Sequence, residues 1–315
     1  MKEWLHMPID GSAHGPQIDD MVSVVHWLML LLFVGWGIYF VYVLIRFRKS
    51  KHPTADPEGT RSHFSKYVEI GVAIFEAILI IGFSIPIWSN IVNAFPAEKD
   101  AVVIRVVAEQ FAWNIHYPGP DGKFGRTDIY LVSADNPLGL DRNDPDAKDD
   151  IATINQMNLP VGKPVIMYLT SKDVIHCLNL PLYRVKHDVI PGQRIPLWFT
   201  PVKTTREIQE ELKQQISIAD GKLSPALEMM VAMTDYNGKD GNQIMKKGDS
   251  FSEELVPQLL QAGITSVSAA PATPTEIACA QLCGLGHFRM RGFITVQTGD
   301  EFNAWLAEQT SYLTQ

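Results

Sequence analysis

The segment between residues 279 and 290 concentrates side chains that bind soft metal ions. In chain order it carries Cys279, Cys283, His287 and Met290. Thiolate, thioether and imidazole ligands suit copper better than they suit magnesium or calcium. A mononuclear blue-copper site uses one cysteine, whereas two thiolates can bridge two copper ions, each of which then needs one imidazole. The segment therefore predicts a dinuclear copper site whose second histidine comes from elsewhere in the chain.

Three further histidines are candidates for that imidazole, namely His116, His176 and His187. His176 is favoured because it stands at the end of an expected strand, before a proline turn. A disulfide between the two cysteines and a zinc site remain alternatives, although structural zinc does not call for a methionine three residues after the histidine. Cys177 is the one other cysteine of the chain. Neighbours on a strand point to opposite faces, so Cys177 is expected to be a buried free thiol and not a ligand.

Two apolar stretches in the first hundred residues predict a transmembrane helix hairpin. Residues 21–45 carry no formal charge, and at about 1.5 Å per residue they are long enough to cross a hydrocarbon core of about 30 Å. They are too long, and have the wrong flanks, for a cleaved signal peptide. Residues 70–92 form the second stretch, in which Pro86 predicts a kink. These stretches and the loop between them make up a hairpin over residues 21–95.

The distribution of positive charge predicts which side of the membrane each part faces. The basic residues of the loop 46–69 are Arg46, Arg48, Lys49, Lys51, Arg61 and Lys66. The one basic residue among residues 1–20 is Lys2. Because lysine and arginine mark the cytoplasmic side, the loop is expected in the cytoplasm, and residues 1–20 and 97–315 are expected on the exported side. The chain is thus predicted to be integral to a bacterial plasma membrane, in contact with lipid, with a periplasmic C-terminal domain.

Residues 97–315 read as an exported all-β domain. Short β-branched and aromatic runs separated by proline and glycine turns are typical of a sandwich or Greek-key barrel. The expected strands lie in AVVIRVVAEQFAWNIHY, TDIYLV, PVIMYLT, IPLWFT and GFITVQ. The span of about residues 203–272 differs from this strand pattern. Its segments TTREIQEELKQQIS and FSEELVPQLLQAGI predict helices, the second interrupted by Pro257. A partly helical insertion on the β-domain is expected there.

Charge limits the choice of partner. The net charge of −8 gives little support to a nucleic-acid partner. Residues 97–315 carry 20 Lys and Arg against 27 Asp and Glu, so the acidity lies in the exported domain. Such a surface would attract a basic protein, or would simply keep the domain soluble.

The sequence resembles subunit II of the cytochrome c oxidases. The family pattern C-x-[EQ]-x-C-x-x-x-H-x-x-M is matched at Cys279, Gln281, Cys283, His287 and Met290. The block SKDVIHCLNLPLYRVKHDVIPG resembles the family's D-V-x-H … K-x-D-x-x-P-G stretch, which points to His176 as the remaining ligand. AEQFAWNIHY resembles the stretch that follows the second helix. Together with the hairpin, the resemblance covers the chain except about residues 203–272.

The resemblance implies a cupredoxin-like Greek-key domain that holds the dinuclear copper centre CuA. The implied ligands are two bridging thiolates, one imidazole for each copper, a weak thioether and a backbone carbonyl, from Cys279 and Cys283, His176 and His287, Met290, and Gln281. Electrons would arrive from a cytochrome c and leave to haem in subunit I, where oxygen reduction is coupled to proton pumping. The chain would then be one subunit of an oxidoreductase and translocase, assembled with subunit I and other oxidase subunits.

Further residues take expected roles from the same resemblance. Glu69 aligns with a glutamate at the mouth of a proton-uptake path, and Glu76, one heptad along, is expected either to substitute for it or to pack against subunit I. Phe111 and Trp113 stand where the family has the aromatic residues at which electrons enter. Gln281 replaces a glutamate whose side chain helps to hold magnesium or manganese at the subunit I interface. A neutral amide is a poorer ligand for such hard cations, which weakens the case for that ion here.

Other functions share parts of this pattern. The CuA subunit of a nitric oxide reductase would have the same ligands and a different catalytic partner. Subunit II of a quinol oxidase would lack the ligands. A non-redox, membrane-anchored metal-binding or assembly protein would bind zinc or form a disulfide, and would be colourless. The chain has no C-x-x-C-H motif, so a fused c-type haem is not expected and the electron donor would be a separate protein.

Overall fold

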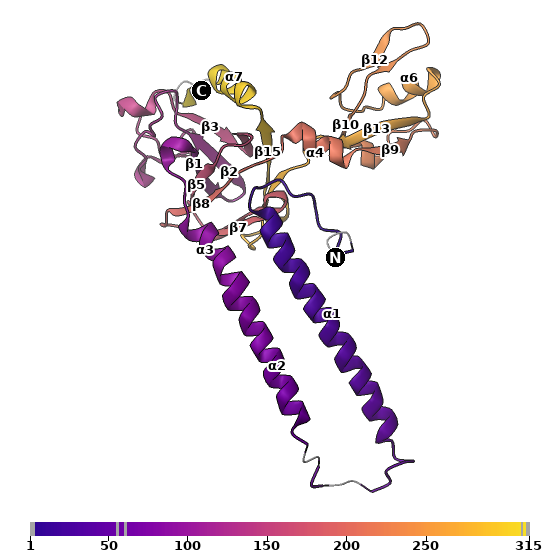
Figure 1. Ribbon diagram of the computed structural model, residues 1–315. Helices are drawn as coiled ribbons and strands as arrows, with labels where there is room; N and C mark the ends of the chain where they lie inside the picture. The colour runs from indigo at the N-terminus through magenta and orange to yellow at the C-terminus, as the bar shows by residue number, and fades with distance from the viewer. Residues whose placement is uncertain (1–3, 55–56, 60–61, 310, 313–315) are drawn as a thin grey trace. The chain divides into compact units, whose positions relative to one another are not determined.

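The computed structural model describes residues 4–54, 57–59, 62–309 and 311–312, so Lys2 and Arg61 lie outside the described residues (Figure 1). The chain divides into two compact units. One contains Met1–Pro8 and His14–Phe95, and the other contains Ile9–Ala13 and Pro96–Gln315. Each unit is described by itself.

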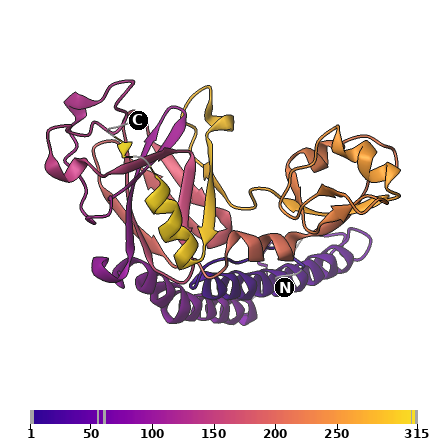
Figure 2. The same ribbon diagram turned by 90° about the horizontal axis from the view of Figure 1, so that it is seen from above.

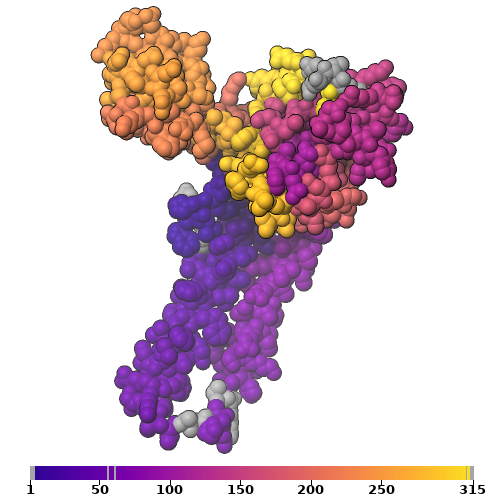
Figure 3. Space-filling model, turned by 180° about the vertical axis from the view of Figure 1, so that it is seen from behind, coloured from indigo at the N-terminus to yellow at the C-terminus, as the bar shows by residue number. Residues whose placement is uncertain are grey.

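The first unit consists of two long apolar helices. The first is α1 (Gly15–Arg46), and the second runs from Phe64 to Asn93. Both are long and apolar enough to cross a membrane. Side chains along them are uncovered (Figure 3), a degree of apolar exposure that fits a membrane anchor. Both helices begin before the predicted stretches, so Glu69 lies inside the second helix and not at its start.

A π-helical segment stands where Pro86 predicted a kink. The second helix comprises α2 (Phe64–Leu79), the π segment η1 (Ile80–Ser84) and α3 (Ile85–Asn93). Proline has no N–H to donate, and its ring collides with the carbonyl four residues earlier. The wider π turn immediately before Pro86 accommodates this irregularity without ending the helix.

The second unit is built on two five-stranded sheets. The first has the order β3-β2-β1-β5-β8, and the second has the order β4-β15-β14-β6-β7. The strands of the first sheet, in chain order, are β1 (Val102–Glu109), β2 (Ala112–Tyr117), β3 (Ile151–Ile154), β5 (Val165–Ser171) and β8 (Ile195–Phe199). Those of the second sheet are β4 (Gln156–Pro160), β6 (His176–Leu180), β7 (Val185–Val189), β14 (Glu276–Cys279) and β15 (Arg291–Gln297). The chain changes sheet between β3 and β4, between β4 and β5, between β5 and β6, between β7 and β8, and again between β8 and β14, which gives the predicted Greek-key, cupredoxin-like arrangement.

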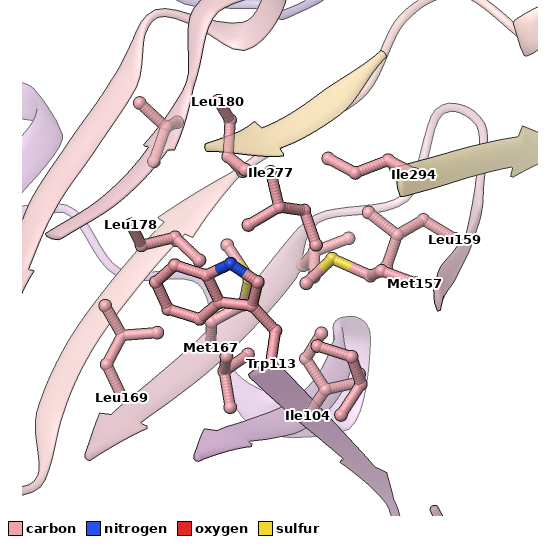
Figure 4. Close-up of a cluster of buried hydrophobic side chains, with 14 of the residues drawn as sticks. Ile104, Trp113, Met157, Leu159, Met167, Leu169, Leu178, Leu180, Ile277 and Ile294 are labelled. Carbon is pink, nitrogen blue, oxygen red and sulfur yellow. The ribbon is translucent and has the colours of Figure 1, made fainter. Parts of the chain in front are cut away.

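The core lies between the sheets. Alternate residues of β1 are buried, as expected of a strand with one face inward. Figure 4 shows Trp113 and Met167 from the first sheet converging on Leu178, Ile277 and Ile294 from the second. Cys279, which ends β14 and begins the cysteine-rich segment, packs against this apolar layer.

One predicted strand is wrong. TDIYLV contains a 3-10 turn, η3 (Ile129–Leu131), and its Tyr130 is 93% exposed. The carboxylate of Asp128 accepts a hydrogen bond from the Tyr130 N–H at 2.9 Å, which bends the chain locally instead of leaving that N–H for a strand ladder. The other four runs form strands at β1 and β2, β5, β8 and β15.

The insertion contains more strand than predicted. Its first helix, α4 (Thr205–Leu212), begins with a capping box between Thr204 and Glu207 and ends early, because Gln214–Ser217 forms strand β9. β9 pairs with β13 (Ser266–Pro271). The remaining elements, orange in Figure 2, are α5 (Pro225–Glu228), β10 (Met230–Ala232), β11 (Tyr236–Asn237), β12 (Gln243–Met245) and α6 (Leu255–Gln261). They enclose an apolar core of their own.

Pro257 does not interrupt α6. It lies at the third position of the helix, and the first N–H groups of a helix have no partner within it. A missing N–H therefore costs little at this position.

Short segments complete the β-domain. Helix α7 (Gly299–Glu308) places Phe302 and Trp305 against the core. Besides η3, four further 3-10 turns of the described residues lie between strands or before the first of them, at η2 (Glu98–Asp100), η4 (Pro145–Ala147), η5 (Pro181–Tyr183) and η6 (His287–Arg289). The segment Ile9–Ala13 also belongs here, because the Gly11 N–H donates to the Leu182 carbonyl and the Gly11 carbonyl accepts from the Val202 N–H, both at 2.8 Å.

Replacing His116 with glutamine should make the β-domain less sensitive to acid. His116 is buried and its Nε2 lies 2.8 Å from Asp150. Burial lowers the pKa of His116 despite the attraction of Asp150. Because this pKa is lower when folded than in the unfolded chain, about 6.5, the folded state loses stability as the pH falls through that value. Chemical denaturation at about pH 7.5 and about pH 5.5 should show a smaller loss for His116→Gln than for wild type. Equal losses of unfolding free energy in the two proteins would contradict His116 as the source of the acid sensitivity.

Candidate metal centre

Strand pairing brings together the two segments that carry the candidate ligands. Cys279 ends β14, and His176 begins β6, its antiparallel neighbour. The pairing continues beyond the strand, since the Ala280 N–H donates to the Cys177 carbonyl at 2.9 Å. His176 and Cys279, 103 residues apart in sequence, therefore face each other at one end of the second sheet.

All six predicted ligand atoms meet in one continuous cluster. The Cys279 sulfur lies 3.8 Å from Nδ1 of His176 and 3.2 Å from the carbonyl oxygen of Gln281. The sulfurs of Cys279 and Cys283 are 3.8 Å apart. On the other side, the Cys283 sulfur lies 3.6 Å from Nδ1 of His287 and 3.8 Å from Sδ of Met290. Each thiol thus lies beside one imidazole and one weaker donor.

These separations fit a metal site and not a disulfide. Two ligands of one tetrahedral ion, each about 2.0–2.3 Å from it, are roughly 3.5 Å apart. A disulfide needs about 2.05 Å between the sulfurs, and both cysteines are free thiols. His176, Cys279 and Cys283 offer ligand atoms within 4.8 Å of one another. The donor set and its spacing could therefore hold metal.

A carboxylate fixes the orientation of the His176 ring. Oδ1 of Asp173 lies 2.9 Å from Nε2 of His176. A carboxylate only accepts, so Nε2 carries a proton, and Nδ1 is the ring nitrogen that faces Cys279. Burial raises the pKa of Asp173, but its hydrogen bonds to His176 and to the N–H groups of Gln110 and Val174 outweigh burial and lower it. Asp173 therefore remains ionised and holds the His176 ring with Nδ1 toward the two cysteines, the orientation that a metal ligand requires.

The two thiols have unequal acidities. Burial opposes ionisation of Cys279, but hydrogen bonds from His176 and from the backbone lower its pKa to about 6. Burial and the neighbouring sulfur of Cys279 raise the pKa of Cys283 to about 11. One thiolate is thus available near neutral pH, and a cation at the site would displace the second proton.

Two of the candidate histidines lie outside the cluster. His116 is paired with Asp150 in the interior. His187 is exposed on β7, with Nδ1 against the Asp188 carbonyl. Cys177 is a buried free thiol, as predicted, and burial raises its pKa to about 11.

The remaining site predictions fall in different surroundings. Trp113 is fully buried, with its ring centroid 6.2 Å from that of His176, so it cannot touch a donor protein directly. Phe111 is half-buried against the loop that carries the cysteines. The Gln281 side chain is exposed. Glu69 and Glu76 are exposed on α2, in the other unit.

Sequence reasoning missed Asp173 and Gln110. Asp173 was visible only as the first residue of the D-V-x-H pattern, three positions before His176. Gln110 begins the β1–β2 turn, and its proximity to the cysteines depends on tertiary structure.

Comparison with known proteins gives a consistent family. Residues 102–207 match the profile described as "Cytochrome C oxidase subunit II, periplasmic domain". "Alternative cytochrome c oxidase subunit 2" of Bradyrhizobium diazoefficiens is 25% identical over 312 residues, covering 98% of this chain and 85% of the relative. Cytochrome c oxidase subunit 2 of Cereibacter sphaeroides is 25% identical over 207 residues, covering 60% of this chain and 66% of the relative.

A solved structure is also similar, namely the periplasmic domain of subunit II of cytochrome oxidase from Bradyrhizobium japonicum. The match has 21% identity and a TM-score of 0.33, and covers 66% of this chain and 92% of that one. The family profile and the curated relatives together cover nearly the whole chain, including the segments that carry the cluster. The chain is thus similar, along nearly its whole length, to subunit 2 of cytochrome c oxidases, which are oxidoreductase complexes.

Proposed function

We propose that the cluster binds two copper ions as CuA, and that the chain passes electrons from a cytochrome c to haem in subunit I of a terminal oxidase. The observation that carries this proposal is the distribution of donors around the two sulfurs. Each sulfur has its own imidazole and its own weaker donor, six atoms in all. A single tetrahedral zinc ion would use four and leave the thioether and the carbonyl without a role.

The assignment of ligands follows the contacts. Cys279 and Cys283 would bridge the ions, His176 and the Gln281 carbonyl would complete one, and His287 and Met290 would complete the other. When bound, the copper pair supplies a one-electron carrier. The chain supplies rigidity, because His176 is fully buried and held by Asp173, while Cys283 and Met290 are buried against the core. Ligands that cannot move keep the rearrangement on electron transfer small.

The partners and the membrane sides are part of the proposal. The helices would anchor the chain beside subunit I, with the loop 46–69 in the cytoplasm and the β-domain in the periplasm, as the basic residues of the loop support. Phe111 would lie on the electron path from the donor, and Trp113 would act from the interior. Gln281 offers only an exposed neutral amide, so we propose that position 281 contributes no carboxylate to a magnesium or manganese site.

Rapid mixing of the purified oxidase complex with reduced cytochrome c tests this function. The near-infrared band of the copper centre should bleach before the haem of subunit I is reduced. A haem that is reduced first, at a rate independent of the copper content, would contradict the proposal. A complex that reduces nitric oxide in preference to oxygen would reassign the chain to a nitric oxide reductase.

Replacing Glu69 with glutamine should slow oxygen consumption without changing the copper centre. The residue is exposed on α2, and the proposed topology puts it at the cytoplasmic end, where protons are taken up. Glu76→Gln is the matched control, two turns along the same helix. The measurement is turnover of the complex in liposomes, with copper content determined alongside. If only Glu76→Gln slowed turnover, the proton-uptake role would belong to Glu76. Full activity in both variants would contradict a proton-uptake role for either residue.

A further inference from the structure

The turn between β1 and β2 touches both halves of the metal centre. Its two residues are Gln110 and Phe111. The β1–β2 turn comes from the first sheet, whereas every ligand belongs to β6, to β14 or to the segment between β14 and β15. Any contact between this turn and the ligands therefore ties one sheet to the other at the site.

The backbone of Gln110 supports the His176 half. Its N–H donates to Oδ2 of Asp173 at 2.7 Å, while Oδ1 of the same carboxylate holds His176 Nε2. Two further groups secure that oxygen, the Val174 N–H at 2.7 Å and the Ser171 hydroxyl at 3.3 Å. Because both carboxylate oxygens are engaged, the carboxylate cannot rotate without breaking several bonds.

The side chain of Gln110 supports the other half. Its Nε2 donates to the backbone carbonyl of Cys283 at 2.5 Å. Phe111 lies against the same loop, where a Cβ added to Gly286 would overlap its ring, and one added to Gly284 would come within 2.7 Å of Gln110 Nε2. The two glycines thus permit a close approach that other residues would prevent. Gln110 therefore links two residues of the site. One is Asp173, which holds the His176 imidazole, and the other is Cys283, whose sulfur lies beside the His287 imidazole.

We propose that Gln110 is a positioning residue that fixes the distance between the two halves of the copper site, an inference that rests on the proposed function. It touches no ligand atom, and it acts through Asp173 on His176 and through the Cys283 carbonyl on the second thiol. Without its amide, the loop between Cys279 and His287 would lose the hydrogen bond that joins the Cys283 carbonyl to the first sheet. The site would then bind copper more weakly and share the unpaired electron less evenly between the two ions.

Gln110→Met tests this role, because methionine keeps the length of the side chain and removes its donor. Gln209→Met is the matched control, since Gln209 also donates from Nε2 to backbone carbonyls, those of Pro271 and Ala272, away from the metal centre. Gln110 is exposed, so the substitution should leave the free energy of unfolding nearly unchanged. The full-length chain in detergent is loaded with copper and titrated with a competing chelator, and its EPR spectrum is recorded.

Gln110→Met should lower copper affinity by about 10-fold, at the lower end of the range for groups that support metal ligands, and should alter the hyperfine pattern. Gln209→Met should change neither. Wild-type affinity and an unchanged spectrum in Gln110→Met would overturn the positioning role while leaving the copper site intact. A wild-type chain that binds no copper would instead overturn the proposed function itself.

Discussion

Replacing Cys283 with serine is expected to abolish the dinuclear centre. A serine hydroxyl does not ionise near neutral pH and cannot bridge two copper ions as a thiolate does. Cys283 also joins the halves of the cluster, since its sulfur contacts Cys279, His287 and Met290. The variant should hold at most one copper per chain and lose the near-infrared absorption. Oxidation of cytochrome c by the assembled complex should fall to background, as stopped-flow and metal analysis of the same sample would show.

Cys177→Ala is the matched control for this loss. Cys177 is also buried and also a free thiol, and it neighbours His176, but no ligand atom of the cluster contacts its sulfur among the described residues. It should retain both copper ions and its spectrum. A Cys177→Ala variant that loses copper while Cys283→Ser keeps it would mean that the cluster has been assigned to the wrong thiols.

The second large effect is expected from Trp113→Ala, and it concerns stability. Trp113 is fully buried between the sheets, where it contacts residues of both and stands edge-on to His176 (Figure 4). Removing so large a side chain from a core costs about 3–5 kcal/mol. A domain is typically stable by only about 5–15 kcal/mol, so the variant should unfold at much lower denaturant concentration and load copper poorly. Denaturation followed by circular dichroism measures the loss directly.

Trp113→Phe separates packing from electron transfer. Phenylalanine restores most of the apolar volume, so stability and copper content should largely return. A rate of electron transfer from cytochrome c that remains low in this variant would support a role for the indole in the electron path. A normal rate would restrict Trp113 to packing beneath His176. A Trp113→Ala variant as stable as wild type would contradict the burial on which both expectations depend.

The half of the site that is local in sequence could be predicted from residue types alone. Cys279, Cys283, His287 and Met290 lie within twelve residues, and their chemistry identifies a soft-metal site without tertiary information. His176 could not be derived in this way, because its proximity to Cys279 depends on the pairing of β6 with β14. Its place at the end of an expected strand favoured it among three histidines, and the resemblance to a family then pointed to it.

The errors in the fold have local physical causes. TDIYLV has the composition of a strand, but the side chain of Asp128 competes for the backbone N–H of Tyr130. In the insertion, the helical pattern of TTREIQEELKQQIS continues past Leu212, yet pairing of Gln214–Ser217 with β13 replaces the last turns of helix. Tertiary pairing outweighs weak helix propensity at such places.

Supporting residues are the hardest part of the site to predict. Asp173 and Gln110 are polar residues in turns, a type that is common at any protein surface. Their function depends on two hydrogen bonds that link segments far apart in sequence, from Gln110 to Asp173 and from Gln110 to Cys283. No periodicity or spacing signals such bonds.

The most direct test of the account is a copper count and an EPR spectrum of the purified full-length chain after loading. The proposed centre requires two copper ions per chain, near-infrared absorption, and a hyperfine pattern in which one unpaired electron is shared between two copper nuclei. One copper per chain, with the electron confined to a single nucleus, would contradict a dinuclear site. Folded protein that binds zinc and stays colourless would contradict electron transfer altogether.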